Sequence, residues 1–78
     1  MTIYQDMRLW RWTLDVDAGE QRYPIAEGRR IWLQVVRGNV EVQGLLLHAG
    51  DGLAVWDDAQ LNLSATVPDT ECLLFDLP

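Results

Sequence analysis

Two residue types that often carry catalysis or bind transition metals occur once each in this 78-residue sequence. His48 is the one histidine and Cys72 is the one cysteine. A nucleophilic site pairs a serine or cysteine with a base, and a metal site needs about three converging ligands. The carboxylates Asp51, Asp57 and Asp58 stand at turn positions, where aspartate ordinarily caps the backbone. The sequence therefore predicts no catalytic residue, no metal site and no cofactor.

His48 and Cys72 remain the weak candidates for chemistry. His48 ends an apolar run before the loop at 50–52, which favours a surface or loop-anchoring role. That loop, GDG, is too short and too acidic to bind a phosphate group. Cys72 lies in an alternating strand pattern, which is typical of a buried and inert thiol. Nothing in the sequence singles out a pair of carboxylates for glycosidic chemistry.

The four tryptophans have two interpretations. They could stack on sugars or flat aromatic ligands, or they could fill a small core and an interface. Their spacing within short strands favours core and interface, because apolar side chains occur on both faces of those strands. The residues expected at an interface are Trp10, Trp12, Trp32, Val36 and Trp56.

Composition limits the partners of the chain. Six arginines stand against twelve acidic residues, which gives a net charge of −6 and a pI near 4.4. Such a surface repels phosphate backbones, so we expect no nucleic-acid binding. No run approaches the roughly 20 apolar residues that cross a membrane, and the first residues lack a secretory pattern. Since no internal disulfide can form either, the sequence predicts a cytoplasmic protein with no membrane partner.

Short alternating segments separated by turn residues predict strands along the whole chain. Arg30–Arg37 is apolar on both faces, which predicts a central strand, and Pro24 places the piece at 23–26 on an edge. Gly38 and Asn39 are expected to form a two-residue hairpin turn. The other expected strands are 7–14, 40–43, 45–47, 53–56, 61–66 and 71–77.

The length allows one domain, residues 1–78. Eight or nine short antiparallel strands imply a closed or nearly closed structure that hides its edges. The predicted fold class is all-β, a small cupin or jelly-roll β-barrel or sandwich.

Several blocks of the sequence resemble a known family. The stretch at 30–40, RIWLQVVRGNV, looks like the middle of a cupin, and 51–57, DGLAVWD, is similar to the second cupin segment. Together with 5–12 and the ending 73–78, these blocks resemble the C-terminal half of bacterial pirin-like proteins, a family that includes quercetin 2,3-dioxygenases. The resemblance extends over residues 4–78.

The resemblance implies a longer chain with two barrels, of which the N-terminal one holds a metal through histidines and a glutamate. In the generic cupin pattern the glutamate would fall at Ile31, two histidines would fall within 23–26, and a further histidine would fall near Leu61. None of these ligands is present. We therefore expect no dioxygenase activity from this chain alone.

We expect a metal-free structural cupin domain that packs against a metal-bearing cupin barrel, or forms a homodimer where that barrel is missing. The alternative is a barrel that binds a small aromatic or sugar ligand. A third interpretation is a metal-independent enzyme that uses His48 or a buried acid. The sequence leaves open whether Met1 begins a natural short protein or a piece of a longer one.

Overall fold

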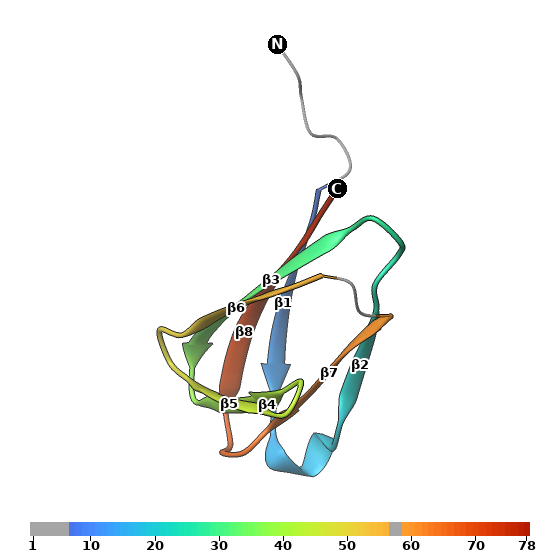
Figure 1. Cartoon of the computed structure of the whole chain (residues 1–78). Helices are drawn as coiled ribbons and strands as arrows, with labels where there is room; N and C mark the ends of the chain where they lie inside the picture. Colours follow the sequence, from blue (N-terminus) through green and yellow to red (C-terminus); the bar gives the residue numbers. More distant parts are fainter. Residues whose placement is uncertain (1–6, 57–58) are drawn as a thin grey trace.

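Apolar and polar side chains alternate along most of the chain, and this pattern favours β-strands. The computed structural model describes residues 7–56 and 59–78, and within them it contains eight strands and one 3-10 turn, η1 (Figure 1). The bounds are β1 (Arg8–Leu14), η1 (Val16–Ala18), β2 (Gln21–Pro24), β3 (Arg30–Arg37), β4 (Asn39–Val42), β5 (Leu45–His48), β6 (Gly52–Val55), β7 (Gln60–Ala65) and β8 (Thr70–Leu77). The predicted strands are thus present, with small differences at their ends.

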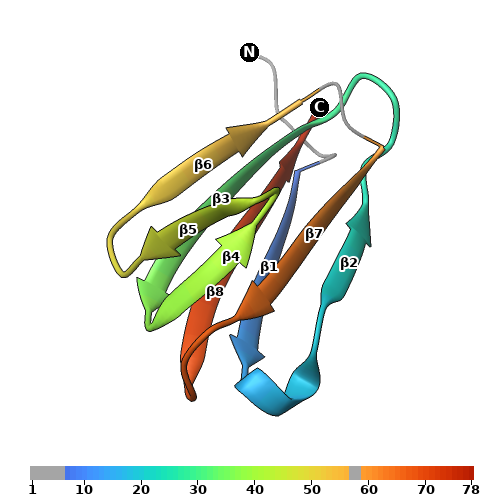
Figure 2. The same ribbon diagram turned by 60° about the horizontal axis from the view of Figure 1, so that its bottom comes forward.

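The strands form two four-stranded antiparallel sheets that lie against each other (Figure 2). Sheet A has the order β1-β8-β3-β6, and sheet B has the order β2-β7-β4-β5. The chain crosses between the sheets at every connection except the one from β4 to β5. This is the arrangement of an eight-stranded jelly roll, and it confirms the predicted fold class.

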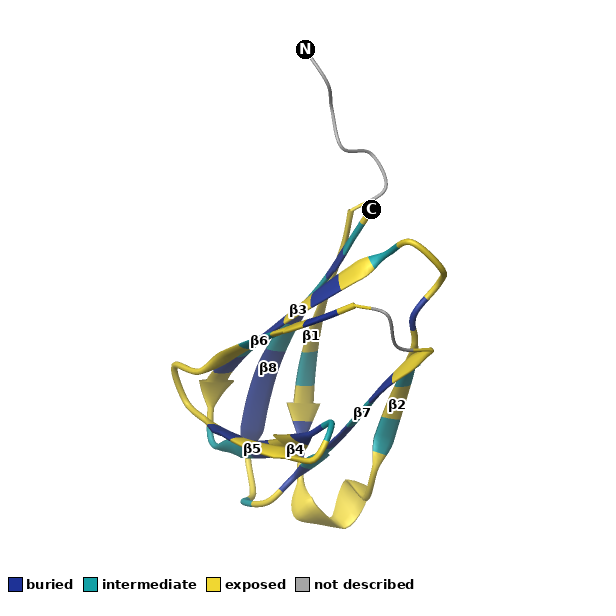
Figure 3. Ribbon diagram, in the orientation of Figure 1, coloured by how far each residue is buried: buried dark blue, intermediate teal, exposed yellow. Residues whose placement is uncertain are grey.

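The core lies between the two sheets, and both contribute side chains to it. Every second residue of β3 and of β7 is buried, and Figure 3 shows buried residues concentrated in β3, β7 and β8. These side chains are aliphatic, so the space between the sheets is filled by apolar packing. The core members that are at most 1% exposed are Ile31, Leu33, Val35, Val40, Val42, Leu61, Leu63, Cys72 and Leu74.

Two predictions about strand position are confirmed. β3 pairs with β8 on one side and with β6 on the other, which makes it a central strand of sheet A. β2, which contains Pro24, is an edge strand of sheet B. A proline lacks the N–H that a central strand must donate on both sides, so the edge is its ordinary place.

The predicted hairpin at Gly38 and Asn39 is wrong, because β3 and β4 lie in different sheets. A β-bulge between Val35 and Arg37 precedes the crossing. Gly38 has a φ of 82°, and a Cβ added there would lie 2.9 Å from the Cα of Thr70. The glycine is therefore needed where the chain passes from sheet A to sheet B close to the start of β8.

The two-residue hairpin turn lies instead at Gln43 and Gly44, between β4 and β5. Both residues have positive φ, 49° and 79°, as a type I′ turn requires. The Gln43 side chain accepts a hydrogen bond from the Asn62 N–H at 2.8 Å and donates one to the Gln60 carbonyl at 3.3 Å. These bonds to β7 hold a glutamine in a conformation that usually selects asparagine or glycine.

Candidate functional site

His48 serves a turn. It ends β5 and is exposed, and its backbone N–H donates to the Asp51 carboxylate at 2.9 Å. The Asp51 N–H in turn donates to the His48 carbonyl at 2.9 Å, and the imidazole Nδ1 lies 3.7 Å from the same carboxylate. Within 7–56 and 59–78 no three His, Cys, Asp or Glu residues are grouped as metal ligands. Asp57, Asp58 and positions 5 and 6 of the first family-like block lie outside the described residues.

Cys72 is a core residue of β8. Its side chain is 1% exposed, and burial raises the pKa of the thiol to about 11, with the nearby Glu71 charge adding to the effect. A protonated and shielded thiol is a poor nucleophile. Because His48 lies on the outside of sheet B, the structure does not bring the two candidates together.

Several positions where the cupin pattern would place ligands point into the core. Ile31 and Leu61 are 1% and 0% exposed. Within the stretch at 23–26, Ile25 is buried and Tyr23 is half-buried. Ile31, Ile25 and Leu61 carry no atom that ligates a metal, and all three belong to one apolar cluster.

The outside of sheet A carries a row of apolar side chains that crosses all four strands. Leu9 of β1 lies opposite Phe75 of β8, Phe75 lies opposite Trp32 of β3, and Trp32 lies opposite Ala54 of β6. Since neighbouring strands are about 4.8 Å apart, these side chains form one continuous surface. We call it the apolar face and define it as Leu9, Trp32, Ala54, Leu73, Phe75 and Leu77.

A hollow lies within the apolar face. It has a volume of about 460 Å³ and is lined by Trp32, Ala54, Leu77, Arg30 and Trp56. The Trp32 indole lies over β6 so closely that a Cβ at position 52 would come within 3.0 Å of its Cε2 atom. The two indoles remain 40% and 57% exposed. Such a hollow can receive an apolar side chain from a partner.

The outside of sheet B is different in character. Its outward side chains, which we call the polar face, are Arg22, Pro24, Asn39, Glu41, Leu46, His48, Gln60, Asn62 and Ser64. Leu46, which is 53% exposed, and the edge residue Pro24 are the apolar exceptions among these positions. A hollow of about 450 Å³ on this side is lined mainly by polar residues, among them Glu20, Glu41 and Asn62.

A charged cluster borders the apolar face. Glu71 accepts from the Arg11 guanidinium at 2.9 Å and lies 3.5 Å from that of Arg37. The Glu71 side chain is 11% exposed, and Arg37 also contacts Asp69 at 3.0 Å. Shared contacts to two arginines compensate the partly buried carboxylate.

The structure divides the five residues predicted for an interface. Trp32 is on the apolar face, Trp56 lies beside it just after β6, and Val36 is 45% exposed at the bulge of β3. Trp10 and Trp12 lie opposite the buried Leu74 and Cys72, so they are on the inward side of β1. Trp12 packs against the core, whereas Trp10 is 46% exposed.

A buried polar cluster at the seam between β1 and β2 was missed by the sequence interpretation. Asp76 is 3% exposed. Its carboxylate accepts from the Tyr23 hydroxyl and from the Arg29 Nε, each at 2.6 Å. Trp10 donates to the same hydroxyl at 3.3 Å, and Trp12 meets the Tyr23 ring edge-on at 6.2 Å. Burial raises the pKa of the Tyr23 phenol, and the hydrogen bond to Asp76 adds to this.

The cluster joins β8 of sheet A to β2 and the loop after it. Its sequence signal was the position of Asp76, which continues the inward alternation of Cys72 and Leu74. A charged residue at an inward position requires partners, and such a residue therefore marks a polar contact that no local motif reveals.

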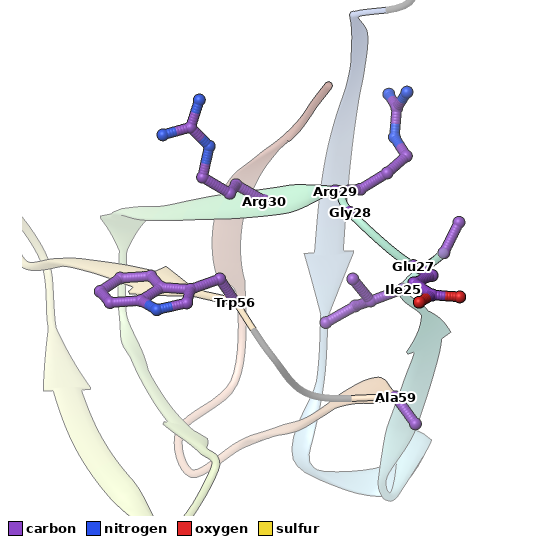
Figure 4. A pocket seen from close by; sticks show the side chains of 8 residues that line it. Ile25, Glu27, Gly28, Arg29, Arg30, Trp56 and Ala59 are labelled. Carbon is purple, nitrogen blue, oxygen red and sulfur yellow. The ribbon is translucent and has the colours of Figure 1, made fainter.

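Figure 4 shows a further hollow, of about 480 Å³, between Trp56 and the loop at 25–30. The Arg29 and Arg30 side chains point upwards in this view, and the Trp56 indole extends to the side opposite Ile25 and Ala59. The lining is mostly apolar and carries one carboxylate, Glu27. These described residues do not make a catalytic set.

The described residues include no helix of the length and apolar character that crossing a membrane demands.

Comparison with known proteins gives matches over the whole chain. A family described as the quercetinase C-terminal cupin domain matches residues 1–77. Quercetin 2,3-dioxygenase of Escherichia coli strain K12 is 45% identical over 78 residues, which are 100% of this chain and 33% of that protein. The chain thus spans about a third of the length of this curated relative.

Solved structures agree. The crystal structure of YhhW from Escherichia coli has a TM-score of 0.87 and 44% identity, covering 97% of this chain and 32% of that one. The structure of bacterial pirin YhhW in complex with nickel(II) also has a TM-score of 0.87, with 43% identity, 100% coverage of this chain and 33% of that one.

Proposed function

This chain belongs to the quercetinase C-terminal cupin domain family of pirin-like proteins, and we propose that it is a metal-free structural domain that packs against a second cupin barrel through its apolar face. The observation that carries this proposal is the row Leu9, Phe75, Trp32 and Ala54, which crosses all four strands on the outside of sheet A. Polar residues flank the row, among them Arg11, Arg30 and Gln34. A contiguous apolar patch on an outer surface is typical of an interaction site.

The relatives are long enough to contain a second cupin barrel besides the part that matches this chain. The matching part is 33% of the Escherichia coli dioxygenase, so about two thirds of that protein has no counterpart here. A second barrel built from that remainder is the occupant we assign to the apolar face. Where that barrel is missing, a second copy of this chain covers the same surface.

The metal-free part of the proposal rests on residue chemistry. Ile31, Ile25 and Leu61 occupy positions where the cupin pattern calls for oxygen or nitrogen ligands, and their side chains pack together in the core. Placing a metal there would require both new ligands and an emptied core. The quercetin oxidation for which the relative is named would then reside outside this domain.

Burial of the apolar face supplies the driving force for packing. Apolar surface removed from water stabilises a complex by about 25 cal/mol per Å², and a specific interface buries at least about 1,000 Å² in total. Trp32 and Trp56 flank the hollow in this surface. Partly exposed tryptophans around a hollow are typical anchors of an interface.

The first test compares two leucines that lie on opposite outer surfaces of the domain and have nearly the same exposed fraction. Leu9 on the apolar face is 54% exposed and Leu46 on the polar face is 53% exposed. In light scattering from micromolar to millimolar concentration, we expect the mass of the wild-type chain to rise from 8.9 kDa towards twice that value. Leu9→Asp should abolish the rise and Leu46→Asp should not. A wild-type mass that stays at 8.9 kDa contradicts self-association.

The second test restores the missing barrel. This chain is spliced in place of the matching third of the Escherichia coli dioxygenase, and the chimera is purified with and without Leu9→Asp or Leu46→Asp. We expect Leu9→Asp to lower the melting temperature of the chimera by several degrees more than Leu46→Asp does. Equal effects of the two substitutions would rule out the apolar face as the contact with the second barrel.

The third test addresses the metal and separates the structural role from catalysis. After a chelator wash we expect the isolated chain to hold no iron, nickel, copper or zinc by mass spectrometry, and to show no turnover of quercetin. One metal per chain contradicts the metal-free role. Turnover that is lost in His48→Ala, with the fold intact, would favour the metal-independent enzyme instead.

A further inference from the structure

A second surface feature is independent of the apolar face and lies at the seam between β1 and β2. These are edge strands of different sheets, since β1 pairs with β8 and β2 pairs with β7. An open hollow of about 390 Å³ lies between them, within the roughly 300–1,000 Å³ of small-molecule pockets. We call it the seam hollow, and its principal lining residues are Arg8, Trp10, Tyr23, Ile25, Arg29 and Asp76.

The charge of the seam hollow is opposite to that of the chain. Arg8 and Arg29 contribute two positive charges and Asp76 contributes one negative charge, so the lining carries +1, whereas the chain carries −6. The Asp76 side chain is 5% exposed, and Tyr23 and Arg29 occupy its two oxygens. Its charge is therefore compensated within the protein and is hardly presented to a ligand.

Arg8 is the cation that a ligand would meet. It is exposed at the start of β1 and has a side-chain hydrogen bond with Tyr23, but no ion pair joins it to a carboxylate of the described residues. A guanidinium binds a carboxylate through two parallel N–H donors. This geometry favours a small organic acid over a neutral or cationic ligand.

The rest of the lining favours a flat ring. The Trp10 indole is 46% exposed, and its Nε1–H is held by the Tyr23 hydroxyl at 3.3 Å, which limits its rotation. Ile25 adds an aliphatic wall. A fixed indole beside an aliphatic side chain can stack on an aromatic ring. A sugar would need several free polar partners, whereas Tyr23 and Asp76 already bind each other.

We propose that the seam hollow binds a small aromatic carboxylate, with its ring against Trp10 and its carboxylate on the Arg8 guanidinium. The ligand lies between the sheets at their open edge rather than in the packed interior. Binding there requires neither a metal nor the second barrel, so the site can be tested on the chain alone.

The test is an NMR titration of the ¹⁵N-labelled chain with benzoate as the probe. We expect saturable shifts at the Trp10 indole N–H with a dissociation constant of about 1 mM. Arg8→Gln should weaken binding about fivefold, the upper range for one exposed ion pair. Arg22→Gln removes an arginine from the polar face and is the matched control, for which no change is expected.

Titrations with benzyl alcohol and with acetate separate the contribution of the aromatic ring from that of the carboxylate. We expect each to bind more weakly than benzoate, since one lacks the carboxylate and the other lacks the ring. The proposal is overturned if benzoate gives no saturable shift up to about 20 mM. It is also overturned if benzyl alcohol binds as tightly as benzoate. It is also overturned if Arg8→Gln changes nothing, or if the largest shifts are at Trp56, beside the other hollow.

Discussion

The two sheets of this domain have the same number of strands, and both bury aliphatic side chains between them, but their outer surfaces differ. Sheet A presents the apolar face, with Leu9, Phe75 and Trp32 in one row. Sheet B presents the polar face, where Leu46 and the edge residue Pro24 are the apolar exceptions among polar side chains. An antiparallel sheet with one face in water normally alternates as sheet B does. This difference is the observation behind the proposed docking role of sheet A.

The strand register makes the apolar side chains of sheet A contiguous. Single exposed apolar residues are ordinary on protein surfaces, whereas contiguous apolar patches mark interaction sites. On sheet A the side chains of four strands align at one level, and the charged cluster around Glu71 ends the patch. The apolar face is therefore a bounded surface, as a docking site requires.

The largest effect tests whether the inner surfaces are truly equivalent. Ile31 of sheet A and Leu61 of sheet B are 1% and 0% exposed. Truncation of either to alanine leaves a cavity, and we expect each to lower the free energy of unfolding by about 2–5 kcal/mol in urea denaturation. A cost below about 1 kcal/mol for one of them would show that the cupin ligand positions are loosely packed on that side.

The sequence predicted the strands, the central place of β3, the edge place of β2 and the family to which the chain belongs. These follow from patterns local to the chain: the two-sided apolar run at Arg30–Arg37, Pro24, and blocks in a conserved order such as 51–57. The family comparison and the strand pairing confirm them.

The sequence did not predict which strands share a sheet or which apolar side chains face outward. Gly38 and Gly44 both stand between strand patterns, and only the three-dimensional pairing shows that the first crosses between sheets. Asp76 contacts Arg29 and Tyr23, which are separated from it by 47 and 53 positions in the sequence. Local periodicity cannot encode such distances, although the inward place of an aspartate indicates that partners exist.

The second prediction compares these two glycines. Both have positive φ, so alanine at Gly44 should cost about 1–2 kcal/mol of stability. At Gly38 a Cβ also collides with the backbone of Thr70, and we expect a loss of about 3 kcal/mol or more. Urea denaturation of Gly38→Ala and Gly44→Ala measures both. Equal losses would mean that the crossing between the sheets relaxes as easily as a hairpin.

The third prediction addresses the seam, where the two sheets are joined by polar contacts. Tyr23→Phe retains the ring that packs against Trp12 but leaves one oxygen of the buried Asp76 without its donor. We expect a loss of about 1–3 kcal/mol in the free energy of unfolding. Trp10→Phe removes the exposed hydrogen bond to the Tyr23 hydroxyl and part of a half-exposed ring, but leaves Asp76 with both of its donors. It serves as the control, with a smaller loss. Equal free energies of unfolding for the two variants would show that the hydrogen bond from Tyr23 to Asp76 does not stabilise the contact between the sheets.

The smallest effect compares the ion pairs at the margins of the two sheets. Glu71, bordering the apolar face, is 11% exposed and contacts two arginines, whereas Glu20, before β2, is 54% exposed and contacts Arg22 alone. Exposed pairs contribute between nothing and about 1 kcal/mol, so we expect Glu71→Gln to cost about 1 kcal/mol and Glu20→Gln less than about half of that. Repeating urea denaturation at about 1 M NaCl, where the screening length falls to roughly 3 Å, should remove most of the exposed contribution and little of the shielded one. A Glu71→Gln variant as stable as Glu20→Gln at both salt concentrations would show that the charged border of the apolar face is held no more firmly than an ordinary surface pair.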